Sequence, residues 1–388
     1  VGSEMCIRDR LASLTTPAFV YDPRIMQAEA EIARRAISRD DAKTHLFLAM
    51  KSYTIRDGLE RLVPELDGLH ASSLFEARLA RELLGPSGKI HLTTPCLRED
   101  EVDELVELCD HVSFNSITQW QRFRDRASPA LSPGLRINPR LSLLADERYD
   151  PSRRHSKLGA AIDDVEQLLK KSPAELDGIR GVLVHTNCDA TDFKPLLATV
   201  KEVSDSLGDW LSTLDWINLG GGYLFDDARH PGALHKAIDL LASKHGVELF
   251  FEPGASLVRR ACVLVSRVVD VFDSAGRQVA VLDTSVNHIP EVFEYQYLHP
   301  VRATSKQHEH LYTLAGATCL AGDVFGDYRF DAPLEVGSFV IFDDVGSYSM
   351  VKASMFNGVN IPTVYRLAEE LTQVKQFGMA EFLSRCGV

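Results

Sequence analysis

The feature of this sequence that most limits its fold is a repeated alternation of β-rich runs and helix-period segments. Eight short runs read as strands: 44–50, 67–72, 89–95, 111–116, 134–139, 181–187, 216–222 and 248–254. Amphipathic stretches such as "LFEARLARELLG" lie between them. Eight strands that alternate with helices predict a (β/α)8 barrel. An open doubly wound sheet is the alternative, but no glycine fingerprint follows the first strand.

The part of the chain after the eighth strand has a different residue pattern. Runs such as "ACVLVSRVVDVFD" and "FVIFDDVGSYS" are rich in β-branched residues and are separated by turns, which predicts a second, mostly antiparallel β domain. The run 16–22 also reads as a strand that joins this sheet. We therefore expect a barrel domain of 23–258 and a β-sandwich-like or barrel-like domain of 11–22 and 259–388. The first ten residues, "VGSEMCIRDR", match nothing that follows and are interpreted as a non-native or disordered leader.

Charge and cysteine content exclude several classes of protein. A net charge of −13 argues against binding to nucleic acid or to an anionic membrane surface, and it is compatible with a cationic small-molecule substrate. No apolar run reaches the roughly 18–20 residues of a membrane span. The seven cysteines are scattered without a CxxC pair, which indicates free thiols in a reducing compartment, here the cytoplasm, and no metal site.

Chemically useful residues stand where the predicted strands end, and this is where barrels place their active sites. They are Lys51, Arg136, His185, Gly220, Gly221, Gly222, Glu252 and Gly254. Each has an ordinary structural explanation when it is taken alone, because lysines often cap strands and glycine runs often form turns. Their joint placement on one rim favours a function.

Together these residues describe a site for pyridoxal 5′-phosphate. A glycine run offers backbone N–H groups to a phosphate, and barrels favour phosphate sites after strands seven and eight. Lys51 could form a Schiff base with an aldehyde once desolvation lowers its pKa. A carboxylate on a neighbouring strand could keep a pyridine nitrogen protonated, and His185 could stack on the ring. No nucleotide loop or Ser-His-Asp arrangement in the sequence competes with this interpretation.

The chain resembles the fold-type III pyridoxal-phosphate enzymes, the alanine racemase and ornithine decarboxylase group, over nearly its whole length from residue 16. Within that group it looks most like the carboxynorspermidine (carboxyspermidine) decarboxylases. The matching pieces are "AMKS", "LHASSLFE", "RINP", "SKLG", "HTNC", "NLGGG", "EPG", "NHIPE", "GATCLAGD" and "GSYSMVKASMFNG". Single pieces are weak signals, but their order and spacing make the set specific.

The resemblance implies a role for each matching residue around the cofactor. Lys51 would hold it covalently, His185 would stack on its ring, and Glu252 would pair with the ring nitrogen. Arg136 would lie near the phenolic oxygen. The remaining cofactor-binding residues, most of them around the phosphate, would be Gly220, Gly221, Gly222, Gly254 and Tyr348.

The resemblance also implies a homodimer with two shared active sites. Cys319 and Asp323, in "TCLAGD", would enter the partner's site, and Cys319 would protonate Cα after the α-carboxyl has left. Glu291 and His288 would also contact the substrate. The implied reaction is decarboxylation of a polyamine-like amino acid, carboxynorspermidine or carboxyspermidine, to norspermidine or spermidine.

Departures from the family pattern leave the substrate open. Ala255 stands where "EPGEA" has a glutamate, and Glu291 stands where an aspartate is usual. Losing a carboxylate opposite an ammonium weakens binding. Diaminopimelate, ornithine, lysine and arginine are therefore alternative substrates, although Leu320 disfavours a simple ornithine or lysine decarboxylase. An amino-acid racemase, a catalytically silent pyridoxal-phosphate-binding protein and a lysine-dependent aldolase are the alternative functions.

Overall fold

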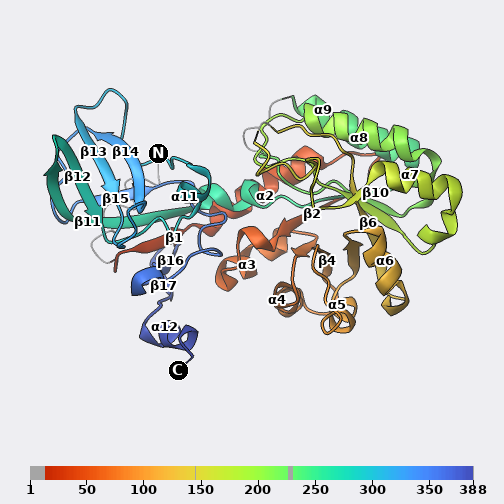
Figure 1. Ribbon diagram of the computed structural model, residues 1–388, viewed down its shortest axis with the longest axis horizontal. Helices are drawn as coiled ribbons and strands as arrows, with labels where there is room; N and C mark the ends of the chain where they lie inside the picture. The colour runs from red at the N-terminus through yellow and green to blue at the C-terminus, as the bar shows by residue number, and fades with distance from the viewer. Residues whose placement is uncertain (1–13, 145, 226–229, 388) are drawn as a thin grey trace. The chain divides into compact units, whose positions relative to one another are not determined.

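The computed structural model describes residues 14–144, 146–225 and 230–387, which form two compact units. Within these described residues, one unit contains Gln27–Lys51 and Leu59–Leu257, and the other contains residues 14–26, Ser52–Gly58 and residues 258–387 (Figure 1). The ten residues interpreted as a leader lie outside the described ranges. None of the helices in the described part of the chain combines the length and apolar character needed to cross a bilayer.

The first unit is a closed barrel of eight parallel strands. They are β2 (Thr44–Ala49), β3 (Gly68–Ala71), β4 (Lys89–Thr94), β5 (His111–Phe114), β6 (Ser132–Asn138), β8 (Gly181–Val184), β9 (Trp216–Asn218) and β10 (Glu248–Phe251). Each strand pairs with the next, and β10 returns to pair with β2, so the sheet has no free edge. The short β7 (Ala160–Ala161) pairs with the last residues of β6. The predicted barrel is therefore confirmed over the open sheet.

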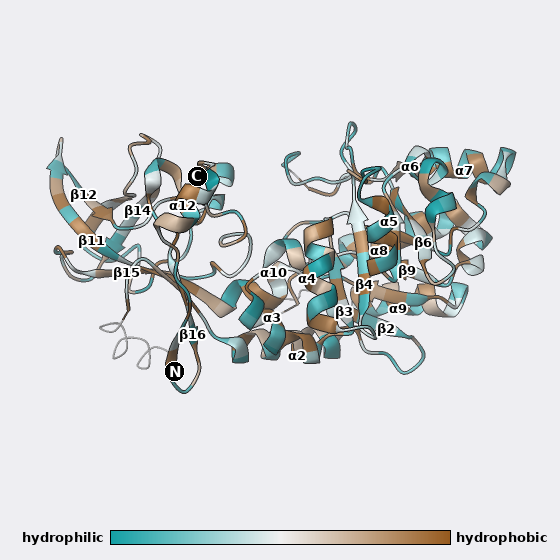
Figure 2. Cartoon of the chain, turned by 90° about the horizontal axis from the view of Figure 1, so that it is seen from below, coloured by the Kyte–Doolittle hydropathy of each residue, from teal (hydrophilic) through white to brown (hydrophobic). Residues whose placement is uncertain are grey.

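Helices alternate with the strands because each amphipathic segment carries its own start and stop signals. Around the barrel strands lie α2 (Pro23–Ile37), α3 (Arg56–Leu62), α4 (Leu74–Leu84), α5 (Val102–Leu108), α6 (Ile117–Phe123), α7 (Ile162–Lys171), α8 (Lys194–Leu207), α9 (Pro231–His245) and α10 (Ala255–Val258). Two further helices, α11 (Glu291–Tyr295) and α12 (Met379–Arg385), belong to the other unit. Ser73 and Ser116 cap α4 and α6 by accepting a backbone N–H, and Gly246 ends α9 with φ of 70°. In Figure 2 the helices carry both hydrophilic and hydrophobic residues, as expected for helices with one buried face.

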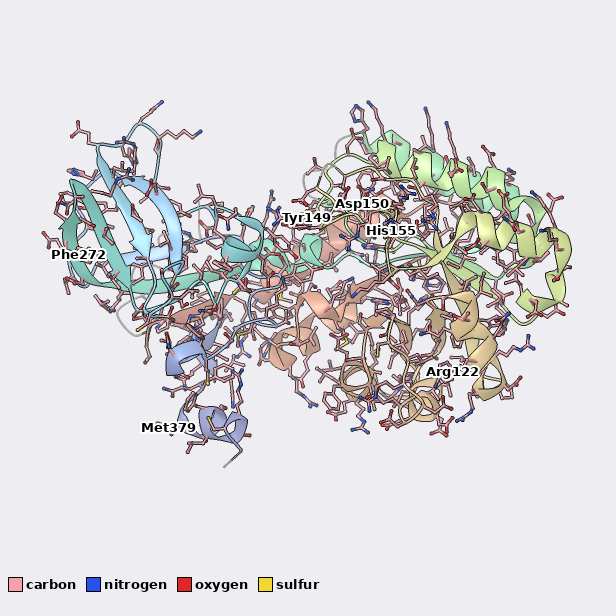
Figure 3. The ribbon with its side chains drawn as sticks, in the orientation of Figure 1. Arg122, Tyr149, Asp150, His155, Phe272 and Met379 are labelled. Carbon is pink, nitrogen blue, oxygen red and sulfur yellow. The ribbon has the colours of Figure 1, made fainter. Side chains whose placement is uncertain are left out.

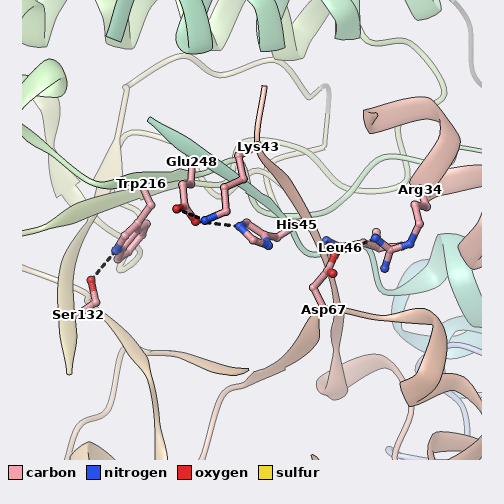
Figure 4. Close-up of polar contacts among 8 residues, drawn as sticks. All are labelled: Arg34, Lys43, His45, Leu46, Asp67, Ser132, Trp216 and Glu248. Atoms are coloured by element: carbon pink, nitrogen blue, oxygen red, sulfur yellow. Dashed lines mark hydrogen bonds and ion pairs between the residues drawn. The ribbon is translucent and has the colours of Figure 1, made fainter. Parts of the chain in front are cut away.

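The base of the barrel holds an aromatic cluster of Phe47, Trp216 and Phe250, and the Trp216 ring depends on glycines in the neighbouring strands. Trp216 is buried, and a Cβ added to Gly134 or Gly181 would overlap its ring. Its indole N–H donates to Ser132 Oγ at 2.8 Å (Figure 4). Nearby, Glu248 binds Lys43 and His45, so polar contacts close this end of the barrel.

The second unit is a mostly antiparallel sheet, as predicted. Its strands are β1 (Ala18–Tyr21), β11 (Cys262–Ser274), β12 (Arg277–Leu282), β13 (His310–Ala315), β14 (Val324–Phe330), β15 (Phe339–Phe342), β16 (Thr363–Leu367) and β17 (Leu371–Lys375). The β1–β16 and β12–β13 pairs are the parallel ones. The core includes Val20, Val265 and Ile341, which come from β1, β11 and β15.

The segment Ser52–Gly58 groups with this sheet unit although it directly follows the first barrel strand. Arg366 Nη1 donates to Asp57 Oδ1 at 2.6 Å, and the Tyr21 hydroxyl donates to the other oxygen of the same carboxylate. Two elements of the sheet unit, β1 and β16, therefore hold the residues that come immediately after Lys51.

Candidate active site

Lys51 lies in the short 3-10 turn Met50–Ser52 directly after β2. Solvent reaches its side chain, although the protein atoms around the amine displace much of its water. This desolvation, with the positive charge of Arg136, lowers the pKa of Lys51 below its ordinary value. A lower pKa raises the share of neutral amine, which is the form that attacks a carbonyl carbon.

Arg136 on β6 is buried, and its guanidinium makes no hydrogen bond and no close ion pair with the described residues, although it feels the charge of Glu252. Burial lowers its pKa to about 10, so the guanidinium stays charged at neutral pH. A buried charge without a partner is costly, and proteins accept that cost where a ligand supplies the opposite charge. Arg136 therefore fits an anionic oxygen of a bound molecule.

Glu252 follows β10 and is buried at the same end of the barrel. Burial raises the pKa of its carboxyl to about 7, while Asn218, Lys51 and Arg136 act in the opposite direction. A carboxyl with this pKa can accept or release a proton near neutral pH. It fits a ligand nitrogen that must be held in its protonated form.

Neighbouring backbone leaves no room for a side chain at Gly221 and Gly222. A Cβ at Gly221 would overlap the carbonyl oxygen of Glu252, and one at Gly222 would overlap that of Asn187. Gly220 and Gly222 also have φ values of 66° and 87°, which other residues rarely adopt. The glycine backbone therefore lies closer to the backbone of Glu252 and Asn187 than a residue with a Cβ would allow.

Two of the three glycine N–H groups are used within the protein. Gly220 N donates to Asn218 Oδ1 at 2.8 Å, and Gly221 N donates to His185 Nδ1 at 3.0 Å. The N–H of Gly222 makes no hydrogen bond with the described residues, so it is the one open to a ligand.

His185 is fixed in a neutral form by the glycine loop. Because Gly221 N–H can only donate, His185 Nδ1 accepts and the ring proton lies on Nε2. Burial, followed by the charges of Lys51 and Arg136, holds the pKa of His185 well below its usual range. A flat, neutral ring whose orientation is fixed is suited to stacking on an aromatic ligand.

The donor set of the barrel rim fits pyridoxal 5′-phosphate. It offers an amine of lowered pKa, an unpaired buried cation, a carboxyl that titrates near pH 7 and a crowded glycine loop. These groups match an aldehyde, an anionic oxygen, a ring nitrogen and a phosphate. Gly254, which is also predicted to bind the cofactor, is buried between Glu252 and α10.

The sheet unit carries the remaining predicted residues. The N–H of Tyr348 (φ 56°) donates to the carbonyl of Ser52, which follows Lys51 in the chain, at 3.0 Å. Cys319 is exposed, and its N–H donates to Asn357 Oδ1 at 2.9 Å. Glu291 is half-buried at the start of α11.

Two predicted substrate-binding residues, Asp323 and His288, are buried within the sheet unit, and their contact with a substrate stays a prediction. The Asp323 carboxylate accepts hydrogen bonds from Val286 N (2.8 Å), Thr318 N (2.9 Å) and Thr318 Oγ1 (2.5 Å). His288 is fully buried, with Nδ1 2.9 Å from Thr284 Oγ1, and burial lowers its pKa to about 4. Two of these hydrogen bonds come from Thr318, next to Cys319, so Asp323 helps to hold the loop that carries Cys319 in shape.

Several polar residues near the rim were not identified from the sequence. Glu76 accepts a hydrogen bond from Ser72 N at 2.7 Å, and burial raises its pKa while Lys51 lowers it. Glu76 could have been recognised from the sequence, because a glutamate three residues after a capping serine, here Ser73, marks the start of a helix. His70, His91 and Asn218 face the barrel interior around Glu252, and nothing in their strands distinguishes them from ordinary inward-facing residues.

The loop between β6 and β7 carries the "SKLG" piece and is held by side chains from its own barrel. Asp150 is buried and accepts from Ser152 N at 2.8 Å and from the Ser142 hydroxyl (Figure 3). Asn115 donates to the Lys157 carbonyl at 2.8 Å. In barrels, the loops at the carboxyl ends of the strands form the binding site, and the hydrogen bonds named here hold this loop in place.

Comparison with known proteins identifies a matching family and full-length relatives. The family model described as "Pyridoxal-dependent decarboxylase, C-terminal sheet domain" matches residues 18–346. A carboxyaminopropylagmatine decarboxylase of Synechocystis sp. is 34% identical over 97% of both chains. A carboxynorspermidine/carboxyspermidine decarboxylase of Herminiimonas arsenicoxydans is 32% identical, over 96% of this chain and 99% of the relative.

Solved structures agree with the described fold. The carboxynorspermidine decarboxylase of Campylobacter jejuni, complexed with norspermidine, has a TM-score of 0.86 and 28% identity, over 96% of this chain and 100% of that one. Diaminopimelate decarboxylase of Helicobacter pylori, complexed with L-lysine, has a TM-score of 0.85 at 17% identity, over 98% of both chains. At that identity the second likeness concerns the fold alone.

Proposed function

This chain belongs to the pyridoxal-dependent decarboxylase family, and we propose that it removes the α-carboxyl of an amino acid with a polyamine tail. The preferred substrates are carboxynorspermidine and carboxyspermidine, which give norspermidine and spermidine. The names of the Herminiimonas and Campylobacter relatives support this choice. The observation that carries the proposal is the joint placement of Lys51, Arg136 and Glu252 at one end of the barrel.

The proposed roles follow from the charge and burial of each group. Pyridoxal 5′-phosphate, when bound, supplies a sink for the electron pair that a departing carboxyl leaves on Cα. Lys51 would hold the cofactor through its amine, and Glu252 would hold a proton on the ring nitrogen. Arg136 would bind the phenolic oxygen, and His185 would pack against the ring.

The proposed phosphate site is built from the glycine run, with Gly254 and Tyr348 completing it. Gly222 N–H is the donor that remains open within the run, while Gly220 and Gly221 shape the loop. We also propose that residues 23–258 act as the cofactor-binding domain. The six described cysteines are free thiols, which supports a cytoplasmic enzyme.

We propose that the enzyme is a homodimer in which Cys319 reaches the partner's site and returns a proton to Cα. An exposed apolar patch surrounds the Cys319 loop and consists of Phe293, Leu298, Leu320, Val324 and Phe356. The Phe293 ring faces Gly322 and the Leu298 side chain faces Gly326, so the patch follows the loop and the strand after it. Exposed apolar patches of this kind are typical of protein interfaces.

A second substrate is favoured by the Synechocystis relative, which is named for carboxyaminopropylagmatine. That molecule ends in a guanidinium rather than an ammonium. Ala255, buried directly after Gly254, leaves out the carboxylate that the carboxynorspermidine pattern places there. A wider, planar cation is compatible with a small residue at this position.

The substrate is tested by giving the purified holoenzyme equal amounts of candidate amino acids and identifying the amines by mass spectrometry. The panel contains carboxynorspermidine, carboxyspermidine, carboxyaminopropylagmatine, diaminopimelate, ornithine, lysine and arginine. The proposal predicts that polyamine-tailed substrates react at least tenfold faster than the short ones. Preferred turnover of diaminopimelate or ornithine would contradict it.

A further inference from the structure

The Glu252 carboxyl, proposed to bind the ring nitrogen of the cofactor, is held by a polar network inside the barrel. We propose that Asn218, held in turn by Gly220 and His91, is a positioning residue that keeps Glu252 charged and turned toward the ring nitrogen of the cofactor. The inference rests on the proposed role of Glu252, and the experiment below separates the two. It concerns β9 and the chain after its neighbour β10, together with β4, which pairs with neither of those strands.

The direction of the Asn218 amide is fixed by the backbone. Gly220 N–H can only donate, and it lies 2.8 Å from Asn218 Oδ1, so the amide oxygen faces the glycine loop. The amide nitrogen must then face the other way. There it donates one hydrogen to Glu252 Oε1 and lies 3.0 Å from His91 Nδ1.

The same logic fixes the proton of His91. Because Asn218 Nδ2 donates, His91 Nδ1 accepts, and its ring proton lies on Nε2, 2.8 Å from Ser113 Oγ. Burial holds the pKa of His91 well below its usual range, so the ring stays neutral. One backbone N–H therefore determines, through Asn218, where the hydrogens of a fully buried chain of side chains lie.

The network stabilises one protonation state of Glu252. A donated hydrogen favours the carboxylate over the acid, and Asn218 lowers the pKa that burial raises. The other charged or titratable groups that face Glu252 are Lys51, Arg136, His70 with Nε2 3.5 Å from Oε2, and His91 with Nδ1 3.7 Å from Oε1. Unlike these groups, Asn218 makes a direct hydrogen bond to the Glu252 carboxyl. Its amide oxygen accepts from Gly220, in the glycine loop proposed to bind the phosphate.

The test uses a cofactor analogue that lacks only the ring nitrogen. Dissociation constants of pyridoxal 5′-phosphate and of its 1-deaza analogue are measured on the apoprotein, and their ratio reports the interaction at the nitrogen. We expect the preference for pyridoxal 5′-phosphate to fall about tenfold in Asn218→Asp, where an acceptor replaces the donor, and a few-fold in His91→Phe. Equal losses for both ligands would reduce the network to a structural role and overturn the inference.

Two further variants make the result unambiguous. His245→Phe is the matched control, because His245 is a buried histidine on α9 whose ring nitrogens lie 2.9 Å and 2.8 Å from Ser204 and Ser212 hydroxyls. It is expected to leave the ligand preference unchanged. Glu252→Gln tests the premise: if it leaves the preference unchanged, the role of Glu252 fails and the inference fails with it. If Glu252→Gln removes the preference while Asn218→Asp and His91→Phe do not, the inference alone is overturned.

Discussion

Asn218 donates a hydrogen bond to Glu252, and the two residues stand at the carboxyl ends of the neighbouring strands β9 and β10. The contact opposes the effect of burial on the Glu252 carboxyl, which nevertheless has a pKa of about 7. A carboxyl with that pKa is partly charged at neutral pH without a ligand. The apoprotein therefore bears a cost that the proposed ring nitrogen would relieve.

The first prediction concerns the pH dependence of this cost. The pKa of Glu252 is about 7 in the folded chain against an ordinary 4.5, so between these values the folded chain binds a proton that the unfolded chain has released. The Glu252 contribution to the free energy of unfolding therefore falls as pH rises through that window. Glu252→Gln should raise the stability of the apoprotein at pH 8 by about 1–3 kcal/mol relative to pH 4.5.

Denaturant titrations of wild type and Glu252→Gln at the two pH values measure this difference. The gain should disappear near pH 4.5, where the wild-type carboxyl is already protonated. A variant that is less stable than wild type at pH 8 would show that the carboxylate is well accommodated without a ligand. The prediction would then be wrong.

Arg136 leads to a second prediction because its buried charge has no partner among the described residues. Arg136→Met should stabilise the apoprotein by about 1–3 kcal/mol while weakening pyridoxal 5′-phosphate binding at least tenfold. Thermal unfolding and a cofactor titration measure the two effects. Arg180→Met is the control, since Arg180 is exposed and pairs with Asp215, and it should change stability by less than about 1 kcal/mol. Unchanged cofactor affinity in Arg136→Met would remove Arg136 from the site.

The third prediction tests the packing at the base of the barrel. Gly181→Ala should destabilise the protein by about 1–3 kcal/mol or more, because the added methyl overlaps the Trp216 ring. Gly232→Ala, in α9, meets no atom within 4 Å and should be neutral or slightly stabilising. Melting temperatures of the two variants compare the sites directly. Equal melting temperatures would mean that Trp216 does not occupy the barrel base as described.

The fourth prediction concerns the apolar patch around the Cys319 loop. Leu320→Arg places a charge on that patch and should shift the protein from dimer to monomer and reduce turnover at least tenfold. Phe272→Arg, at an equally exposed position on β11 (Figure 3), should keep the mass and activity of the wild type. Light scattering and initial rates are the measurements. A monomeric wild type with full activity would contradict the proposed shared site.

The barrel could be predicted because each strand is a short apolar run bounded by turns, and the number of runs matches a closed sheet. Lys51, His185, Gly220 and Glu252 could be proposed as site residues because each lies within two residues of a strand's carboxyl end, and the topology brings those ends together. These signals are local, so they can be recognised in a single sequence. The partner of a residue on a distant strand cannot be recognised in this way.

The unpredicted part of the site is made of such distant partners. Asn218 and His91 are separated by 127 positions, and only the closed barrel brings their side chains to hydrogen-bonding distance. The burial of Asp323 and His288 was also not predictable, because hydrogen bonds from Val286 and Thr318 and contact with Thr284 hold them inside the sheet unit. Burial of a polar side chain depends on what surrounds it, and a strand pattern does not contain that information.

The most direct test of the central claim is release of labelled CO2 from α-carboxyl-labelled carboxynorspermidine and carboxyspermidine by the holoenzyme and by Lys51→Ala. The expected result is stoichiometric CO2 and polyamine from the wild type and no release from Lys51→Ala, which should keep its circular dichroism spectrum. Turnover by Lys51→Ala at the wild-type rate would contradict the account. So would a fully loaded wild type that releases CO2 from neither substrate nor from carboxyaminopropylagmatine.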